Sequence, residues 1–217
     1  MISKTGLIIT GGAVNTAFAR EFMKNRQYDV IIAADAGLKV LDRIGVRPDT
    51  VVGDLDTADP QLVGRYRLDG DIEFEIHPPE KDETDTELAV TKAVKMGCGR
   101  VDILGALGGR IDHELANIQL LLVCREIGLQ AYLIDERNRI HLTYPGERFR
   151  KEELYGKYIS FIPLTEEVKG LTLRGFRYPL EHRDVKMGPS RLISNEVEEE
   201  GLILFEEGKL LCVESHD

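Results

Sequence analysis

The chain has 217 residues, of which 42% are hydrophobic and 30% charged, with a formal net charge of −10 and an isoelectric point near 5.1. This composition is ordinary for a globular protein, and the length allows one large domain or two modest ones. The acidic balance argues against nucleic acid or an anionic membrane as a partner, because both reward a basic surface. A nucleotide bound through magnesium is compatible with it.

The beginning of the sequence, its apolar segments and its cysteines indicate the cellular compartment. Residues 1–5 lead into a short apolar run without the long apolar stretch and cleavage site of a secretory signal. No segment approaches the roughly 18 uninterrupted apolar residues of a membrane-spanning helix. We therefore expect a cytoplasmic protein. The cysteines Cys98, Cys124 and Cys212 are odd in number and far apart, which favours reduced, packed thiols over disulfides or a zinc site.

Short apolar runs alternate with helical spacing through about residue 135. Strands are expected at 7–10, 30–34, 50–52, 72–76, 101–104 and 131–134, and helices at 16–24, 38–44, 86–96 and 114–127. This alternation predicts an α/β fold in which helices flank a parallel sheet, as in Rossmann-like domains. Ligands of such sheets bind beyond the carboxyl ends of the strands.

The pattern changes after Arg139. Short apolar runs separated by Gly, Pro and charged turns then predict an all-β region, and 145–153 reads as a boundary. We expect an N-terminal α/β domain at 1–143 and a C-terminal all-β domain at 144–217. The charged run at 181–184 suggests a solvated turn.

Two carboxylates follow an expected strand at Asp54 and Asp56. Side chains at i and i+2 point the same way on an extended backbone, and a divalent cation would relieve their repulsion. Asp35 also follows an apolar run, and a third acidic segment contains Asp85. The alternative is a solvated turn or a helix cap, because Asp is common in both and 84–87 matches a capping box. A cap would also fix Asp85 rigidly, so the two interpretations are compatible.

A glycine-rich loop follows the strand expected at 101–104. Glycines let backbone amides approach phosphate oxygens, the next helix start favours anions, and an arginine offers a bidentate cationic group. The alternative is an ordinary turn with a capping aspartate and a surface histidine. The candidate residues are Gly108, Gly109, Arg110, Asp112 and His113.

Together these segments resemble the thiamine pyrophosphokinase family. The resemblance lies in Ala-Asp-Ala-Gly at 34–37, Gly-Asp-Leu-Asp-Thr at 53–57, Asp-Glu-Thr-Asp at 82–85 and Gly-Ala-Leu-Gly-Gly-Arg-Ile-Asp-His at 105–113. Two later segments resemble the thiamine-binding part of the bacterial members: Gly-Phe-Arg-Tyr-Pro-Leu at 175–180 and Ser-Arg-Leu-Ile-Ser-Asn-Glu at 190–196. The similarity spans nearly the whole chain, with its motifs in the family's order.

This resemblance implies transfer of pyrophosphate from ATP to the hydroxyl of thiamine, giving thiamine diphosphate and AMP, with magnesium required. It implies that 1–143 is the catalytic domain that binds ATP and magnesium and that 144–217 is a β-sandwich that binds thiamine. It also implies a homodimer whose active sites lie between subunits.

The resemblance also implies roles for the acidic and glycine-rich motifs. Asp54, Asp56 and Asp85 would hold magnesium, with waters and phosphate oxygens completing its octahedron. Asp35 would either support the metal shell or receive the thiamine hydroxyl proton. Arg110, with the amides of Gly108 and Gly109, would grip the nucleotide phosphates, while Asp112 and His113 would shape the rest of the ATP site.

For thiamine, the resemblance points to Ser194 and Asn195 as hydrogen-bonding partners of the aminopyrimidine ring. Some family members place a Trp over thiamine, but this chain has none. Tyr178 or Phe176 would then supply the aromatic face beside the cationic thiazolium. The alternatives are a hairpin turn at 194–195 and two aromatic rings packed in the sandwich core.

Two other functions use the same motifs. A non-catalytic nucleotide sensor would bind magnesium and a nucleotide as a signal, and a magnesium-dependent phosphohydrolase would use water in place of thiamine. Neither explains the match at 194–195.

Overall fold

The computed structural model describes residues 3–56, 58–68, 70–78 and 80–217. Thr57 of the acidic motif lies outside the described residues. The chain divides into two compact units, Met1–Glu136 and Arg137–Asp217. The second unit therefore begins before the boundary expected from sequence at 143/144.

The first unit alternates strands and helices. In chain order its elements are β1 (Lys4–Ile9), α1 (Thr16–Lys24), β2 (Val30–Ala34), α2 (Gly37–Ile44), β3 (Thr50–Gly53), α3 (Pro60–Leu68), β4 (Glu73–Ile76), α4 (Asp85–Lys95), β5 (Cys98–Leu104), α5 (Ile111–Glu126) and β6 (Gln130–Ile134). All six strands and all four helices expected here are found; α1 and β2 have the expected ends, and the ends of the others are shifted.

Helix α3 was not expected from the apolar pattern. The helix buries only Leu62 and Val63, and a glycine, Gly64, follows them in its middle. Its sequence therefore has little apolar periodicity. Its start nevertheless follows local rules: Asp59 Oδ1 accepts a hydrogen bond from the amide of Gln61 at 2.9 Å, and a proline occupies the first helical position.

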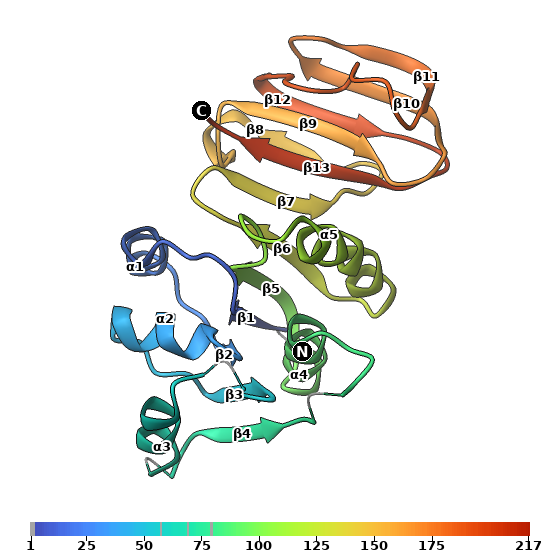
Figure 1. Cartoon of the computed structure of the whole chain (residues 1–217). Coiled ribbons are helices and arrows are strands. Elements are labelled where there is room, and N and C mark those ends of the chain that lie inside the picture. The colour runs from blue at the N-terminus through green and yellow to red at the C-terminus, as the bar shows by residue number, and fades with distance from the viewer. Residues whose placement is uncertain (1–2, 57, 69, 79) are drawn as a thin grey trace. The chain divides into compact units, whose positions relative to one another are not determined.

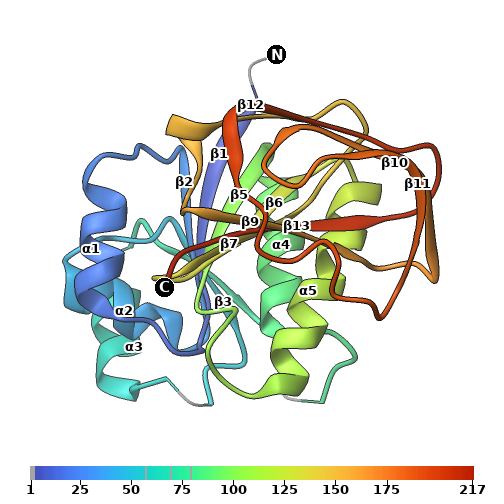
Figure 2. The ribbon, with the colours of Figure 1, turned by 90° about the horizontal axis from the view of Figure 1, so that it is seen from above.

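The strands of the first unit pair in parallel in the order β4-β3-β2-β1-β5-β6. The chain runs outward from β1 to β4 and then returns to β5 on the other side of β1. Helices α1, α2 and α3 lie on one side of the sheet, and α4 and α5 on the other (Figures 1 and 2). Because the connections after β1 and β5 leave toward opposite faces, a crevice forms at the carboxyl ends of these two strands.

Burial explains why the central strands read as continuous apolar runs. Leu7, Ile8 and Ile9 of β1 are fully buried, as are Ile32 and Ile103 in the flanking strands. When helices cover both faces of a parallel sheet, the side chains on both faces of each strand are buried, so consecutive residues are apolar. The apolar run therefore ends where the strand leaves the core, and polar residues begin there.

The second unit is made of strands. They are β7 (Asn138–Leu142), β8 (Arg148–Arg150), β9 (Tyr158–Pro163), β10 (Glu167–Phe176), β11 (Leu180–Lys186), β12 (Val197–Leu204) and β13 (Leu210–Ser215), with a short 3-10 helix at Lys151–Glu153. Strand β13 pairs antiparallel with β7 and β9, and a separate antiparallel sheet has the order β11-β10-β12-β8. Side chains from both groups form one core, including Phe161, Leu171, Phe176, Ile203 and Leu210.

The expected turn at 181–184 is wrong, because these residues lie within β11. The four side chains are exposed, and β11 forms an edge of its sheet. Charged residues on an edge strand discourage pairing with another chain, which accounts for a strand without apolar alternation.

Across the described residues, no helix is both long enough and apolar enough to span a bilayer.

Candidate functional site

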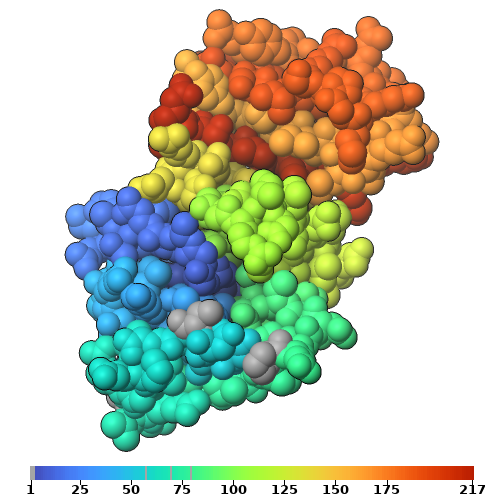
Figure 3. All heavy atoms as spheres, in the orientation of Figure 1, coloured from blue at the N-terminus to red at the C-terminus, as the bar shows by residue number. Residues whose placement is uncertain are grey.

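A cavity of about 670 Å³ opens in the first unit where β1, β2, β3 and β5 end. Its lining comes from the loops after these strands, from the loop between β4 and α4, and from the starts of α4 and α5. Figure 3 shows this part of the surface, where blue atoms near the N-terminus meet cyan and green ones. The volume suits a ligand of nucleotide size.

Close approach of two loops shapes the floor of this cavity. A Cβ atom added to Gly12, which follows β1, would lie 2.0 Å from the carbonyl oxygen of Gly105, which follows β5. Only glycine permits this contact. Gly105 also has a φ of 81°, so the loop after β5 needs glycine for its conformation as well.

Three carboxylates converge beside these loops. Oxygen atoms of Asp35, Asp54 and Asp56 lie within 4.8 Å of one another. Asp35 has a φ of 48° and Leu55 a φ of 61°, left-handed conformations that are rare outside glycine and concentrate at functional sites. The backbone amide of Asp56 donates to Asp54 Oδ1 at 3.0 Å, which turns the segment back on itself.

Asp85 reaches the same place from α4. Thr84 caps this helix by accepting a hydrogen bond from the amide of Glu87 at 3.3 Å, as the capping motif predicts. A Cβ built on Gly53 would lie 3.2 Å from Asp85 Oδ1. Asp85 is outside the three-carboxylate group, but it lines the same cavity as Asp54 and Asp35.

Lys81 lies among these carboxylates, and the sequence motifs did not identify it as a site residue. Its Nζ is 2.7 Å from Asp85 Oδ1 and 3.7 Å from Asp54 Oδ2. Burial opposes its charge, but hydrogen bonds and attraction from Asp85 and Asp54 hold the pKa of Lys81 above its usual value. The amide of Asp56 is the main cause that lowers the pKa of Asp54, and Lys81 adds to it.

The glycine-rich loop forms the opposite wall. Gly109, Arg110 and His113 line the cavity, whereas Gly108 and Asp112 are outside its lining. Arg110 Nη2 lies 2.5 Å from Asp112 Oδ2 in an exposed ion pair.

Two further residues of α5 complete this wall, and neither was identified from sequence. Glu114 accepts a hydrogen bond from the amide of Gly109 at 2.6 Å. Buried Asn117 donates to the carbonyl oxygen of Ala106 at 2.9 Å and ties the loop to the helix.

The expected thiamine residues lie in the second unit, where Tyr178 and Asn195 line a cavity of about 390 Å³. Tyr178 lines it with 59% of its surface exposed. Phe176 is 2% exposed and stacks edge-on with Phe161 in the core, so the core-packing alternative holds for Phe176 and not for Tyr178.

Asn195 also lines this cavity, but the residue is only 4% exposed. Its Oδ1 accepts from the amide of Tyr178 and its Nδ2 donates to the carbonyl oxygen of Tyr178, each at 2.9 Å. The neighbouring Ser194 has a φ of 57°, and its amide donates to Ser160 Oγ at 2.9 Å. Ser194 is exposed but is not among the residues that line the cavity.

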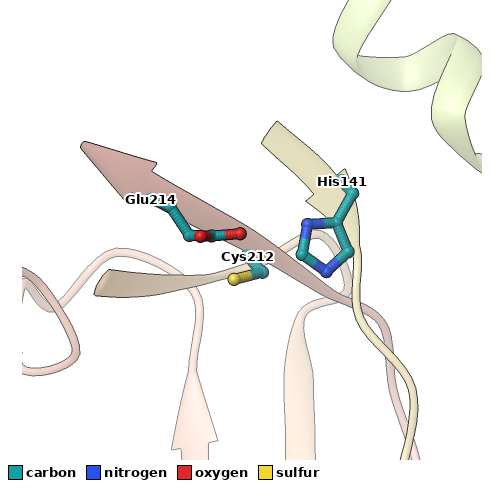
Figure 4. Close-up of side chains that lie close together, drawn as sticks. All are labelled: His141, Cys212 and Glu214. Atoms are coloured by element: carbon teal, nitrogen blue, oxygen red, sulfur yellow. The ribbon is translucent and has the colours of Figure 1, made fainter. Parts of the chain in front are cut away.

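A second set of potential metal ligands, His141, Cys212 and Glu214, lies buried in the second unit (Figure 4). Arg139 binds both carboxylate oxygens of Glu214, at 2.9 and 2.6 Å, so a cation would have to displace a guanidinium. Burial also raises the pKa of the Cys212 thiol well above its usual value, which disfavours the thiolate that metals bind. We interpret this group as a buried polar network.

Comparison with known proteins gives consistent matches over both units. The profile described as "Thiamin pyrophosphokinase, catalytic domain" matches residues 21–133, and "Thiamin pyrophosphokinase, vitamin B1 binding domain" matches residues 148–210. Thiamine pyrophosphokinase from Bacillus subtilis is 34% identical over 99% of this chain and 100% of its own.

Solved structures agree with these matches. A crystal structure of the Bacillus subtilis protein aligns with a TM-score of 0.87 and 33% identity, over 99% of this chain and 100% of that chain. A thiamin pyrophosphokinase structure from Geobacillus thermodenitrificans aligns with a TM-score of 0.81 and 30% identity, over 98% of both chains.

Proposed function

The chain belongs to the thiamine pyrophosphokinase family, and from this premise we propose how its residues carry the reaction. The enzyme transfers pyrophosphate from ATP to the hydroxyl of thiamine and releases AMP. One observation carries the assignment to the cavity of the first unit: Asp35, Asp54 and Asp56 bring carboxylate oxygens within 4.8 Å of one another, beside a glycine-rich loop. This combination suits a phosphate chain with its counter-cation.

The carboxylates fit magnesium by their chemistry. Magnesium prefers hard oxygen ligands and is usually held by one or two carboxylates together with substrate phosphates and water. We assign Asp54, Asp56 and Asp85 to this role, with Asp35 beside them. When bound, the metal neutralises charge on the transferring phosphates. Asp35 either supports the metal shell or accepts the thiamine proton, and its place in the oxygen cluster favours the first role.

The loop before α5 is assigned to the ATP phosphates. Gly108 and Gly109 immediately precede α5, and anions are favoured at the start of a helix. Arg110 is 74% exposed at its side chain and can exchange Asp112 for a phosphate at little cost, because exposed ion pairs are weak. His113 lines the cavity beside it and is assigned with Asp112 to the edge of the nucleotide site.

Thiamine is assigned to the cavity of the second unit. The exposed ring of Tyr178 is suited to lie against the thiazolium cation. Ser194, which is exposed next to the lining residue Asn195, is assigned to the aminopyrimidine. Asn195 already bonds to the backbone of Tyr178 through both polar atoms of its side chain. We therefore propose that Asn195 positions the Tyr178 segment.

The arrangement of the whole enzyme is also proposed. The parallel sheet with its crevice between β1 and β5 supports a Rossmann-like description of the catalytic part, expected at 1–143, and 144–217 is assigned to thiamine. We propose a homodimer with active sites between subunits, and a cytoplasmic location because ATP is a substrate. At a thiamine concentration far below the KM of the Asn195→Ala protein, a mixture of Asp56→Asn and Asn195→Ala proteins should turn over faster than the two proteins measured apart, if one site draws residues from two subunits.

The test of the function follows both products. Purified protein is mixed with ATP, magnesium and thiamine, and each component is omitted in turn. Equal amounts of AMP and thiamine diphosphate that depend on all three components are expected. ATP binding without AMP would instead indicate a nucleotide sensor. Release of phosphate or pyrophosphate without thiamine would indicate a hydrolase.

A further inference from the structure

Lys81 lies where a metal ion bound by both Asp54 and Asp85 would also lie. Its ammonium contacts Asp85 Oδ1 at 2.7 Å and lies 3.7 Å from Asp54 Oδ2. The side chain is 10% exposed and lines the cavity. The same carboxylate lone pairs cannot serve a close ammonium and a coordinated cation at once, so the two compete.

The other basic side chain at this cavity is placed differently. Among the described lining residues, the lysine and arginine side chains are Lys81 and Arg110. Arg110 is 74% exposed at its side chain and pairs with Asp112 on the surface. Lys81 is enclosed by the carboxylates themselves, where charge interactions are screened least. It is therefore the positive charge with the strongest influence on what these carboxylates bind.

We propose that Lys81 is a resident cation that competes with the divalent metal for Asp54 and Asp85, so that the nucleotide-free pocket binds metal weakly. Nucleotide phosphates attract the ammonium and release both carboxylates to the metal. Lys81 is thus a positioning residue that makes metal and nucleotide bind together. This inference rests on the proposed function, because it takes Asp54 and Asp85 as metal ligands.

Coupling of this kind is reciprocal. If the nucleotide raises the affinity of the pocket for metal, then metal raises its affinity for the nucleotide by the same factor. Removal of the Lys81 charge should tighten the binding of metal alone and reduce this factor. A purely structural lysine would show neither effect.

The experiment measures Mn²⁺ binding to the full-length protein without nucleotide, by electron paramagnetic resonance of the free ion. Lys81→Met keeps the length of the side chain and removes its charge. We expect its Kd for Mn²⁺ to be at least about tenfold lower than that of the unaltered protein, because one charge at contact distance is removed. Lys81→Gln, which retains a polar end, should change the Kd in the same direction.

Lys92→Met is the matched control. Lys92 is similarly enclosed, with a side chain 8% exposed, and it contacts Glu73 at 2.6 Å and Glu75 at 3.1 Å, but it does not line the cavity. Its loss should leave the Kd for Mn²⁺ unchanged. Circular dichroism melting verifies that each variant is folded. With α,β-methylene ATP added, the gain in metal affinity should be smaller in Lys81→Met than in the unaltered protein.

An unchanged, weaker or undetectable affinity for Mn²⁺ in both Lys81 variants would overturn the proposal. Asp54→Asn separates this failure from failure of the site assignment. If Asp54→Asn weakens metal binding in the presence of α,β-methylene ATP while the Lys81 variants do not tighten it without nucleotide, only the role of Lys81 is lost. If Asp54→Asn has no effect on metal binding, the metal site itself is misassigned.

Discussion

The carboxylate of Glu114 lies 2.6 Å from the backbone amide of Gly109 and accepts its hydrogen bond. Glu114 belongs to the first turn of α5 and lines the cavity of the first unit. A charged oxygen at this amide makes the kind of hydrogen bond that a phosphate oxygen would make. Nucleotide that uses this donor must first displace Glu114.

Glu114→Gln should therefore strengthen ATP binding. The substitution removes a negative charge beside the phosphates and weakens the internal hydrogen bond, so we expect a Kd for ATP about three- to tenfold lower. Isothermal titration in the absence of thiamine gives this value. Glu126→Gln, at the far end of the same helix, is the control and should have no effect. Weaker ATP binding by Glu114→Gln would mean that Glu114 supports the site.

Asp56→Asn should abolish turnover while leaving the fold intact. The amide keeps the size of the side chain but cannot supply a carboxylate to a metal. We expect kcat to fall at least about 100-fold, with a thermal midpoint within a few degrees of the original. Asp71→Asn is the control, because Asp71 is 85% exposed at its side chain. Near-normal turnover by the Asp56 variant would remove Asp56 from the site.

The fold of the first unit, and the gathering of Asp35, Asp54 and Asp56 at the carboxyl ends of its strands, could be predicted from sequence because the signals are local. Buried parallel strands read as apolar runs, and the polar residue after each run marks the carboxyl end of a strand, as at Asp35 and Asp54. The capping motif at Thr84 predicted the start of helix α4. Helix α3 and strand β11 were missed because few of their side chains are buried.

Two residues that line the cavity of the first unit could be found only in the three-dimensional structure. Lys81 precedes α4 and lies among acidic residues, so in sequence it reads as an ordinary solvated charge. Only the fold brings it to Asp54, which follows a different strand. Glu114 likewise reads as a favourable residue in the first turn of a helix, and its contact with Gly109 depends on the path of the loop.

The ion pairs between β4 and α4 should make stability depend on pH. Glu75 is partly buried, which alone would raise its pKa, but hydrogen bonds from Lys92 and His77 outweigh burial and hold the pKa below its usual value. A depressed pKa stabilises the fold above the unfolded pKa, and this contribution is lost as the pH falls through the folded value.

Glu75→Gln tests this dependence. The original protein should lose more stability than the variant between pH 7 and pH 3, by about 1 kcal/mol or less because Glu75 is partly solvated. Urea unfolding at both pH values gives the difference. Glu181→Gln, on an exposed pair with Arg174, is the control. Equal losses of stability in the original protein and in Glu75→Gln would show that the contacts of Glu75 with Lys92 and His77 do not contribute.

Asn195 should act on thiamine through Tyr178. Its side chain bonds to both the amide and the carbonyl oxygen of Tyr178, so Asn195→Ala releases the segment that presents the exposed ring. We expect the KM for thiamine to rise about tenfold, with the KM for ATP unchanged, since one or two buried hydrogen bonds are lost. Tyr178→Leu should also raise the KM for thiamine, whereas Tyr178→Phe, which keeps the ring, should not.

A double-mutant cycle decides whether the two residues act together. If Asn195 works by holding Tyr178, the Asn195→Ala/Tyr178→Leu protein should be little worse than Tyr178→Leu alone. Tyr144→Leu is the control for loss of an exposed tyrosine, because Tyr144 is 43% exposed and outside the cavity. Additive effects on the KM for thiamine would instead show that Asn195 contributes independently of Tyr178. An unchanged KM for thiamine in Tyr178→Phe, together with a raised KM in Tyr178→Leu, would identify the aromatic face as the group that Asn195 positions.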